Sequence, residues 1–281
     1  MDQPVVVGDA NGREDEVQLL RAANHQLTLS ALESQRREST ATAAYRQQAA
    51  FLATVAHELR NPLLPLRLAA QMLTRARTDE TALAALQATI TSQVADIGRL
   101  INDLLDGSRI STGKFRLERT VVDIDSLIHL AVRTCTPAIE QRKHRLSISM
   151  PQGPIKVLGD RLRLMQVFDN LIGNAAKYTL PGGQIAIDVS VQAAEVAVSI
   201  KDNGTGISPE TLPHIFDLYV QDTHVEGVAA GGLGIGLAVV RELVTAHEGS
   251  VVATSDRERG GSEFVVRLPL ATVGLSAPVL A

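Results

Sequence analysis

The chain has 281 residues, 45% of them hydrophobic, which is enough for one large or two modest globular domains. A net charge of -4, a pI near 6.0 and evenly spread basic residues exclude a strongly basic binding surface, so we expect no nucleic acid partner. One cysteine, Cys135, excludes a disulfide framework, while short apolar runs and a missing signal pattern predict no membrane span and, if Met1 is the true start, a cytoplasmic location.

The amino-terminal region is predicted to contain a tail and a helix. Residues 1–11 carry Pro, Gly, Asp and Asn without periodicity, which is typical of a disordered tail. Residues 12–42 show a short heptad pattern that fades after Ser34 and predicts a helical, coiled-coil segment. Asn24 lies in this seam, where an asparagine can fix the register of a dimeric coiled coil. The positions at heptad spacing are Val17, Leu20, Asn24, Leu27 and Ala31.

Two longer helices are predicted over about residues 45–75 and 81–109, because apolar residues recur there every three or four positions. Leu100 and Leu105 widen the second apolar stripe beyond what one partner helix covers, so two such hairpins should pack into a four-helix bundle. We therefore expect a homodimer, with residues 43–110 as its dimerisation domain. The two stripes are Leu52, Val55, Leu59, Leu63, Leu66, Ala70 and Leu73, and Leu83, Leu86, Ile90, Val94, Ile97, Ile101 and Leu104.

The first of these helices carries a histidine beside a carboxylate, His57-Glu58. At about 100° per residue, His57 lies roughly 120–160° around the helix from most of the apolar stripe, so its ring should face outward. Arg60 and Asn61 share its face. Pro62 removes the amide that would bond the carbonyl of Glu58 and predicts a bend. The alternative is an ordinary surface histidine with a solvated neighbour.

From residue 115 the pattern changes to short alternating segments mixed with helices, which indicates a second domain over residues 115–270, followed by a tail over 271–281. Helices on one side of an antiparallel-rich sheet predict an α+β fold of the α/β sandwich type. The predicted helices are 125–141, 161–178 and 235–247. The predicted strands are 145–150, 155–158, 185–191, 196–202, 250–255 and 263–268.

A polar face is predicted on the helix 161–178. Asn170, Asn174 and Lys177 step by four and three residues, so two amide carbonyls and an ammonium group lie on one side. Hard oxygen ligands of this kind suit Mg²⁺, which shares phosphate oxygens with its ligand, and Lys177 would add charge for those phosphates. A solvated polar face remains the alternative.

Asp202 is predicted to be buried at the end of its strand, because counting by twos from Val196 places it on the inward, apolar face. A buried carboxylate without a partner costs several kcal/mol, and a donor such as the exocyclic amine of adenine would satisfy it. The glycines of Asn203–Ile207 allow the backbone to pass close to a flat base. A glycine-rich turn alone is a weak signal.

A second glycine segment, Gly231–Leu237, leads directly into the helix 235–247. Glycines before a helix start expose amides that can bind phosphate oxygens, and the helix dipole is positive there. The segment lacks the Walker ending and the βαβ setting of the dinucleotide fingerprint. Pro209–Ala230, between the two glycine segments, is predicted to be a lid over the site.

Five short segments, in this order along the chain, resemble motifs of the sensor histidine kinases of two-component systems, whose ATPase module is shared with gyrases, heat-shock chaperone ATPases and mismatch-repair proteins. One departure is Tyr219, where the family commonly has a second phenylalanine. The matching segments are His57–Pro62 for the phosphoacceptor box, Asn170–Thr179 for the asparagine box, Asp202–Gly206 and Gly232–Leu237 for two glycine boxes, and Ile215–Asp217 for the phenylalanine box.

The resemblance implies a helical hairpin of the HisKA type that forms a dimeric four-helix bundle, followed by an ATP-binding α/β sandwich of the HATPase_c (GHKL, Bergerat) type. ATP and Mg²⁺ are the implied ligands. The implied catalytic residues are His57, Glu58 and Asn61, and the implied Mg²⁺ ligand is Asn174 with Asn170 beside it. The implied ATP-binding residues are Asn170, Asn174, Lys177, Tyr178, Asp202, Gly204, Gly206, Ile207, Gly232, Leu233, Gly234, Gly236 and Leu237.

The implied activity is that of a protein histidine kinase, an ATP:protein-L-histidine phosphotransferase. It would phosphorylate His57, with Glu58 as general base, and pass the phosphoryl group to an aspartate of a response-regulator receiver domain. Asn61 could orient a water that dephosphorylates the regulator. Its input would be the signalling segment 12–42 or an upstream sensory partner. The alternatives are a nucleotide-gated interaction protein (a pseudokinase) and a gyrase-like or chaperone-like ATPase.

Overall fold

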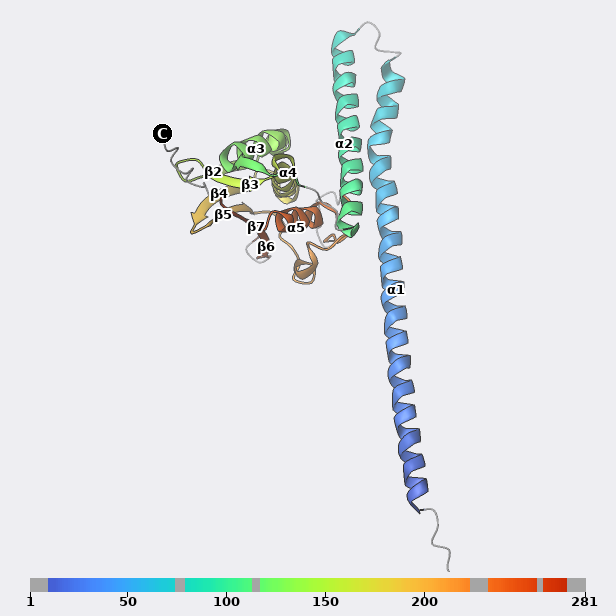
Figure 1. The fold of residues 1–281 in the computed structure, drawn as a ribbon. Coiled ribbons are helices and arrows are strands. Elements are labelled where there is room, and N and C mark those ends of the chain that lie inside the picture. The colour runs from blue at the N-terminus through green and yellow to red at the C-terminus, as the bar shows by residue number, and fades with distance from the viewer. Residues whose placement is uncertain (1–9, 74–78, 113–116, 223–231, 257–259, 272–281) are drawn as a thin grey trace, which may run out of the picture. The chain divides into compact units, whose positions relative to one another are not determined.

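The computed structural model describes residues 10–73, 79–112, 117–222, 232–256 and 260–271 (Figure 1). The chain divides into two compact units, Met1–Ala53 and Thr54–Ala281. The first unit contains most of one long helix. The second contains the end of that helix, a further helix and a mixed domain. The predicted tail 1–11 lies largely outside the described residues, as does most of the tail 271–281.

The long helix α1 spans Ala10–Leu73 without interruption, so the two helical segments predicted before and after residue 42 are one helix. Its start at Ala10 is two residues earlier than predicted. Pro62 and Pro65 both lie inside it, and the helix continues past both prolines. The predicted bend at Pro62 and the coiled-coil pairing of residues 12–42 stay predictions.

Helix α2 spans Glu80–Thr112 and begins after Asp79, whose Oδ1 accepts a hydrogen bond from the amide of Ala82 at 3.0 Å. This N-cap satisfies one of the free amides of the first turn. Much of the predicted apolar stripe is uncovered in the single chain: Leu63 is 54% exposed and Val94 57% exposed. Further exposed apolar side chains of this unit's helices are Leu64, Leu68, Met72, Leu73, Ile101 and Leu105.

The mixed domain is the predicted α/β sandwich, and the α+β fold class is confirmed. Its main sheet has the order β2-β4-β5-β7-β6, with β2 and β4 parallel and the other pairs antiparallel. A separate antiparallel pair, β1-β3, was not expected. The strands are β1 Thr120–Asp123, β2 Arg145–Ser149, β3 Lys156–Gly159, β4 Gln184–Gln192, β5 Glu195–Asp202, β6 Ser250–Ser255 and β7 Ser262–Pro269. The helices are α3 Ile124–Gln141, α4 Arg161–Tyr178, α5 Gly236–Ala246 and the short 3-10 turn η1 Leu212–His214.

The core of this domain is formed by the inward-facing residues of its strands and the apolar sides of its amphipathic helices. Ile185 and Ile187 on β4 are buried and alternate with more exposed residues, whereas on β5 Val196 and Val198 are buried together with Ala197 between them. Helices α3 and α4 start at aspartate N-caps, Asp123 and Asp160, whose carboxylates accept amide hydrogen bonds of the first turn. Fully buried Phe168 and Leu171 lie on the inner side of α4, which directs its polar side elsewhere.

A buried histidine joins two of these helices. His247, at the end of α5, accepts a hydrogen bond at Nε2 from the amide of Asp160 (2.9 Å), and its Nδ1–H donates to the carbonyl of Leu243 (2.7 Å). Burial lowers the pKa of His247 below its ordinary value of 6.5, while Leu243 and Asp160 oppose and Arg119 adds to the decrease. The imidazole is therefore neutral in the folded protein, because only the neutral ring can accept at Nε2 while it donates from Nδ1.

His247→Gln is expected to lower the free energy of unfolding by about 1–2 kcal/mol at pH 7.5, because two hydrogen bonds are disturbed. The difference from the parent should shrink as pH falls below 6.5, since the unfolded parent then gains a proton that its folded form does not bind. Urea unfolding of both proteins at pH 7.5 and 5.5 measures it. The raised carboxyl pKa values of Asp103 and Asp169, about 6, affect both proteins and cancel in the difference. A difference that does not change with pH contradicts the prediction.

Candidate functional site

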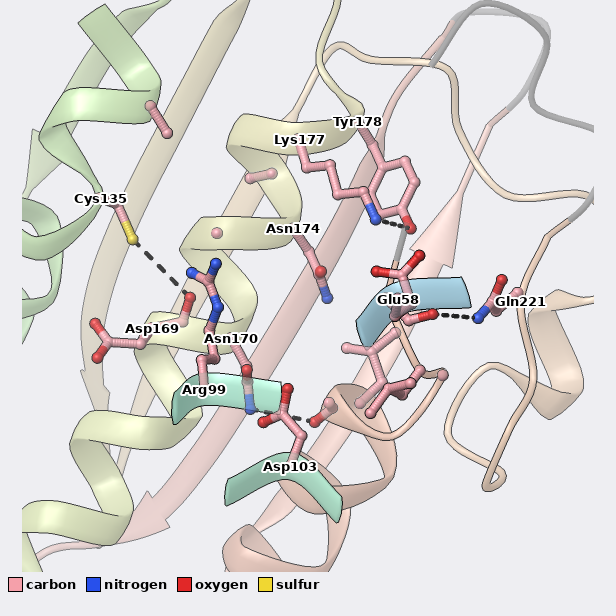
Figure 2. A pocket seen from close by; sticks show the side chains of 18 of the residues that line it. Glu58, Arg99, Asp103, Cys135, Asp169, Asn170, Asn174, Lys177, Tyr178 and Gln221 are labelled. Carbon is pink, nitrogen blue, oxygen red and sulfur yellow. Dashed lines mark hydrogen bonds between the residues drawn. The ribbon is translucent and has the colours of Figure 1, made fainter. Parts of the chain in front are cut away.

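The polar face predicted on α4 exists and is directed into a cavity (Figure 2). The amide Nδ2 of Asn170 lies 3.4 Å from the carbonyl of Gly236, at the start of α5, which orients the Asn170 side chain. One turn later Asn174 lies on the same side. The Lys177 ammonium donates to the hydroxyl of Tyr178 (3.2 Å) and lies 4.8 Å from the centre of its ring. Two amides and a cation therefore line one wall.

Asp202, at the end of β5, is buried as its inward position predicted, with 5% of its surface exposed. Its Oδ1 accepts from the amide of Gly204 (2.8 Å) and its Oδ2 from the hydroxyl of Ser262 (2.7 Å). Burial raises the pKa of Asp202, and these hydrogen bonds oppose the increase. Each carboxylate oxygen can accept a further hydrogen bond, so the group can still receive a donor from a ligand.

The two glycine segments adopt conformations that favour glycine. Gly206, Gly232 and Gly234 have φ angles of 68°, 117° and 66°. The amide of Tyr219, inside the predicted lid, donates to the carbonyl of Gly234 at 2.8 Å, which joins the described part of that segment to the second glycine segment. Of the predicted lid, residues 223–230 lie outside the described part, as does Gly231.

A cavity of about 720 Å³ brings the predicted nucleotide residues together. Gly204 is the exception: it is buried beside Asp202, its amide is used by that carboxylate, and it does not line the cavity. Sequence reasoning missed Ser262 and Phe264 on β7, and Gln221. The predicted residues that line it are Asn170, Asn174, Lys177, Tyr178, Asp202, Gly206, Ile207, Gly232, Leu233, Gly234, Gly236 and Leu237.

The segment that resembles the phenylalanine box, Ile215–Asp217, contributes to the wall of the cavity. Ile215 is buried and lines it, and the ring of Phe216 packs edge-on against Phe264 at a centroid distance of 6.2 Å. Asp217 pairs with His214 (3.0 Å) and with Arg241 of α5 (3.1 Å). These partners, His214 first, lower the pKa of Asp217. The segment is thereby attached to the helix that follows the glycines.

The three residues predicted on α1 differ in position. His57 is exposed, as its place on the helix predicted, and does not line the cavity. Glu58, labelled in Figure 2, does line it. Asn61 and Pro62 line it too. All of them belong to the second compact unit, as do the residues that line the rest of the cavity.

A cluster that the sequence did not reveal connects α2 with α4. The carboxylate of Asp106, 3% exposed, accepts from Arg163 Nη1 (3.2 Å to each oxygen) and from Gln166 Nε2 (2.6 Å). Nearby, burial raises the carboxyl pKa of both Asp103 and Asp169 to about 6 and the thiol pKa of Cys135 to about 11. Cys135 is thus an un-ionised buried thiol.

The fold and the site together define a class: an ATPase-type α/β sandwich that follows helices carrying an exposed histidine. Two family models match the chain. Residues 47–113 match the His Kinase A (phospho-acceptor) domain, and residues 159–272 match the histidine kinase-, DNA gyrase B-, and HSP90-like ATPase. The chain belongs to the sensor histidine kinase family of two-component systems.

Curated relatives agree with this family. The probable sensor histidine kinase TcrY of Mycobacterium tuberculosis is 34% identical over 263 residues, which is 93% of this chain and 53% of that protein. The signal transduction histidine-protein kinase BaeS of Escherichia coli is 33% identical over 223 residues, 78% of this chain and 46% of that protein. The chain therefore spans about half the length of these relatives.

Two solved structures share the fold. ShkA, solved at full length in complex with AMPPNP, is 28% identical with a TM-score of 0.56 and covers 78% of this chain and 45% of its own. The histidine kinase AdeS of Acinetobacter baumannii, 24% identical with a TM-score of 0.55, covers 76% of this chain and 98% of its own.

Within the described ranges, no helix combines the length and apolar character that crossing a bilayer requires.

Proposed function

We propose that this protein is an ATP-dependent histidine kinase that phosphorylates His57 and passes the phosphoryl group to an aspartate of a receiver domain. The observation that carries the proposal is the single cavity in which Asp202, the asparagines of α4 and the second glycine segment meet. Membership of the sensor histidine kinase family supports it, as does the same activity in the names of the relatives. Because the reaction consumes ATP, the proposal includes a cytoplasmic location.

The cavity fits ATP from its base to its phosphates. The Asp202 carboxylate keeps acceptor capacity for the exocyclic amine of adenine, and Ile207 and Tyr178 supply apolar and aromatic surface for the base. Lys177 supplies positive charge for the phosphates. The glycine segment before α5 supplies backbone amides at the positive end of that helix.

Asn174, with Asn170 beside it, is the proposed Mg²⁺ ligand. Since Mg²⁺ takes hard oxygen ligands and keeps several waters, the ion would be shared between amide oxygens, water and the phosphates of the nucleotide. Bound Mg²⁺ would neutralise charge on the phosphates during transfer.

In the transfer step, one imidazole nitrogen of His57 bonds to the γ-phosphorus of ATP while the bond to the β,γ-bridging oxygen breaks and ADP leaves. The Glu58 carboxylate holds the tautomer whose lone pair attacks and takes the proton of the other ring nitrogen. Positioning and electrostatics supply most of the rate. In the second step, a receiver aspartate takes the phosphoryl group and the histidine is restored.

Asn61 is the proposed water-orienting residue for dephosphorylation of the regulator. It is one turn from His57, is exposed, and lines the cavity. A side-chain amide can both donate to and accept from a water molecule, which suits this role. The proposal also includes an upstream sensory partner or the segment 12–42 as the source of the signal.

A homodimer is the proposed assembly. The apolar residues left exposed on the helices of the second unit, such as Leu63 and Val94, need a partner surface, and a second hairpin in a four-helix bundle would cover them. The matched phospho-acceptor domain, residues 47–113, covers these positions.

The proposal is tested by incubating the protein with γ-labelled ATP and Mg²⁺ and examining the stability of the label on the protein. Phosphohistidine should be lost in acid and retained in base, and the label should move to a receiver domain that is added afterwards. A protein that binds ATP but gains no acid-labile label would instead be a nucleotide-gated interaction protein.

Asn174→Ala is expected to remove most of the Mg²⁺ dependence of ATP binding. Loss of outer-shell partners alone costs roughly 10–100-fold in metal affinity, so loss of a ligand should cost at least about tenfold. Calorimetric titration with ATP, with Mg²⁺ and with a chelator, measures it in parent and variant. Equal gains on adding Mg²⁺ to both proteins would show that Asn174 does not ligate the ion.

A further inference from the structure

Gln221 is the last but one described residue before the segment 223–231, and Gly232 is the first described residue after it. The side-chain amide of Gln221 donates from Nε2 to the carbonyl of Gly232 at 2.7 Å (Figure 2). Two residues earlier, the amide of Tyr219 donates to the carbonyl of Gly234 at 2.8 Å. Residues 219–221 therefore run beside the glycine segment and are bonded to it twice.

The position of Gln221 is fixed from the other side by its neighbour. Asp222 accepts from the backbone amide of Ser208 at 2.7 Å, and Ser208 is fully buried, with its hydroxyl bonded to that of Thr211 at 2.8 Å. The chain at 221–222 is thus attached both to the loop after the first glycine box and to the second glycine box. A side chain held in this way can orient the peptide that it contacts.

The close approach of residues 219–221 to the glycine segment requires a residue without a side chain at position 234. A Cβ on Gly234 would lie 2.9 Å from the carbonyl carbon of Tyr219 and from the oxygen of Val220, so backbone packs directly on backbone there. Among the described residues other than its chain neighbours, a Cβ on Gly232 would meet the Lys177 ammonium, at 3.7 Å, and no other atom within 4 Å. The open side of Gly232 therefore faces the cation that we assign to the phosphates.

The orientation of one peptide group follows from these contacts. In a trans peptide the carbonyl of Gly232 and the amide N–H of Leu233 point in opposite directions. Since Gln221 holds the carbonyl on its own side, the Leu233 N–H points away from the Gln221 amide. Both Gln221 and Leu233 line the cavity, so the orientation of this peptide decides which of its groups a ligand meets. A carbonyl turned inward would instead repel phosphate oxygens.

We propose that Gln221 is a positioning residue for the triphosphate: it holds the Gly232–Leu233 peptide so that an amide, and not a carbonyl, faces the phosphates. This inference rests on the proposed function, because it assigns a role within the same nucleotide site. It names the phosphates, and not the adenine, as the part of the ligand that depends on Gln221. The hydrogen bond of the Gln221 amide goes to Gly232, on the phosphate side of the proposed site.

The test compares ATP with adenosine. Gln221→Met keeps the length and neutrality of the side chain but cannot donate, so affinity for ATP should fall about fivefold, the equivalent of one neutral hydrogen bond. Affinity for adenosine, measured by ligand-observed NMR, should stay unchanged, which also shows that the variant is folded. Gln192→Met, at an exposed position at the end of β4, is the matched control and should behave as the parent.

Two results overturn the inference: unchanged ATP affinity in Gln221→Met, or equal losses for ATP and adenosine, which would indicate a general structural role. Gln221→Asn, which retains the amide but is one methylene shorter, should resemble Gln221→Met. A parent that binds ATP no more tightly than adenosine would instead contradict the proposed function itself. That outcome is read from the parent alone and is separate from the behaviour of the variants.

Discussion

His57→Gln is expected to abolish acid-labile labelling from γ-labelled ATP while leaving ATP binding unchanged. Glutamine has no nucleophilic ring nitrogen, so the phosphoryl group has no acceptor at this position. Because His57 is exposed and does not line the nucleotide cavity, neither folding nor affinity for ATP should depend on it. The measurements are label retained after base treatment and calorimetric affinity for ATP.

A matched control exists on α3, where His129 forms a similar pair with a carboxylate. Its Nδ1 lies 2.8 Å from Asp125 Oδ1, and both side chains are about half exposed. His129→Gln should leave labelling at the level of the parent. Acid-labile label that persists in His57→Gln and disappears in His129→Gln would move the acceptor to the other helix and sink the assignment of His57.

Asp202→Asn is expected to reduce ATP affinity by roughly 100-fold or more. The asparagine loses the negative charge, and its NH₂ group must face either the Gly204 amide or the Ser262 hydroxyl, both of which now donate to the carboxylate. Hydrogen bonds to charged groups contribute about 1.5–3 kcal/mol, and an unsatisfied buried donor adds a further cost. Calorimetric titration with ATP and adenosine measures the loss, which should be similar for both ligands.

The Asp202 prediction has a control on the neighbouring strand and a pH signature. Ser262→Ala removes one donor but keeps the carboxylate, so most adenosine affinity should remain. Burial raises the pKa of Asp202, so the free site gains a proton at a higher pH than an ordinary aspartate does. Adenosine affinity of the parent should therefore fall as pH decreases through that raised pKa, whereas Asp202→Asn should show no such decrease. A parent with flat pH dependence from pH 7.5 to 4 would contradict the role of the ionised group.

The helices and strands near the site could be predicted because their signals are local. The period of α4 placed Asn170, Asn174 and Lys177 on one side, and the alternation of β5 placed Asp202 inward. Helix α4 and strand β6 have the predicted bounds. The continuous α1 was missed because a fading heptad pattern was interpreted as an end, although nothing in the sequence terminates the helix there.

What the sequence could not predict depends on contacts between distant segments. Ser262 reaches Asp202 only because β7 pairs with β5, and a serine has no pattern that reveals this partner. Gln221 is hydrogen bonded to the carbonyl of Gly232, eleven positions further along the chain, and no local pattern of the sequence predicts such a contact. Asp106 is a buried carboxylate on a helix whose sequence period gives no indication of Arg163 and Gln166 as partners.

Beside Asp202, just outside the cavity lining, backbone packs directly on backbone. Cβ atoms on Gly204 and Gly261 would collide with the carbonyl oxygens of Tyr178 and Asp202, and Gly261 has a φ of 102° that side chains rarely adopt. No side chain can therefore be introduced there to reshape the pocket. Under the proposed function, engineering for a different base would therefore act through the side chains that line the cavity, such as Asp202, Ser262, Ile207 and Tyr178, and not through this backbone.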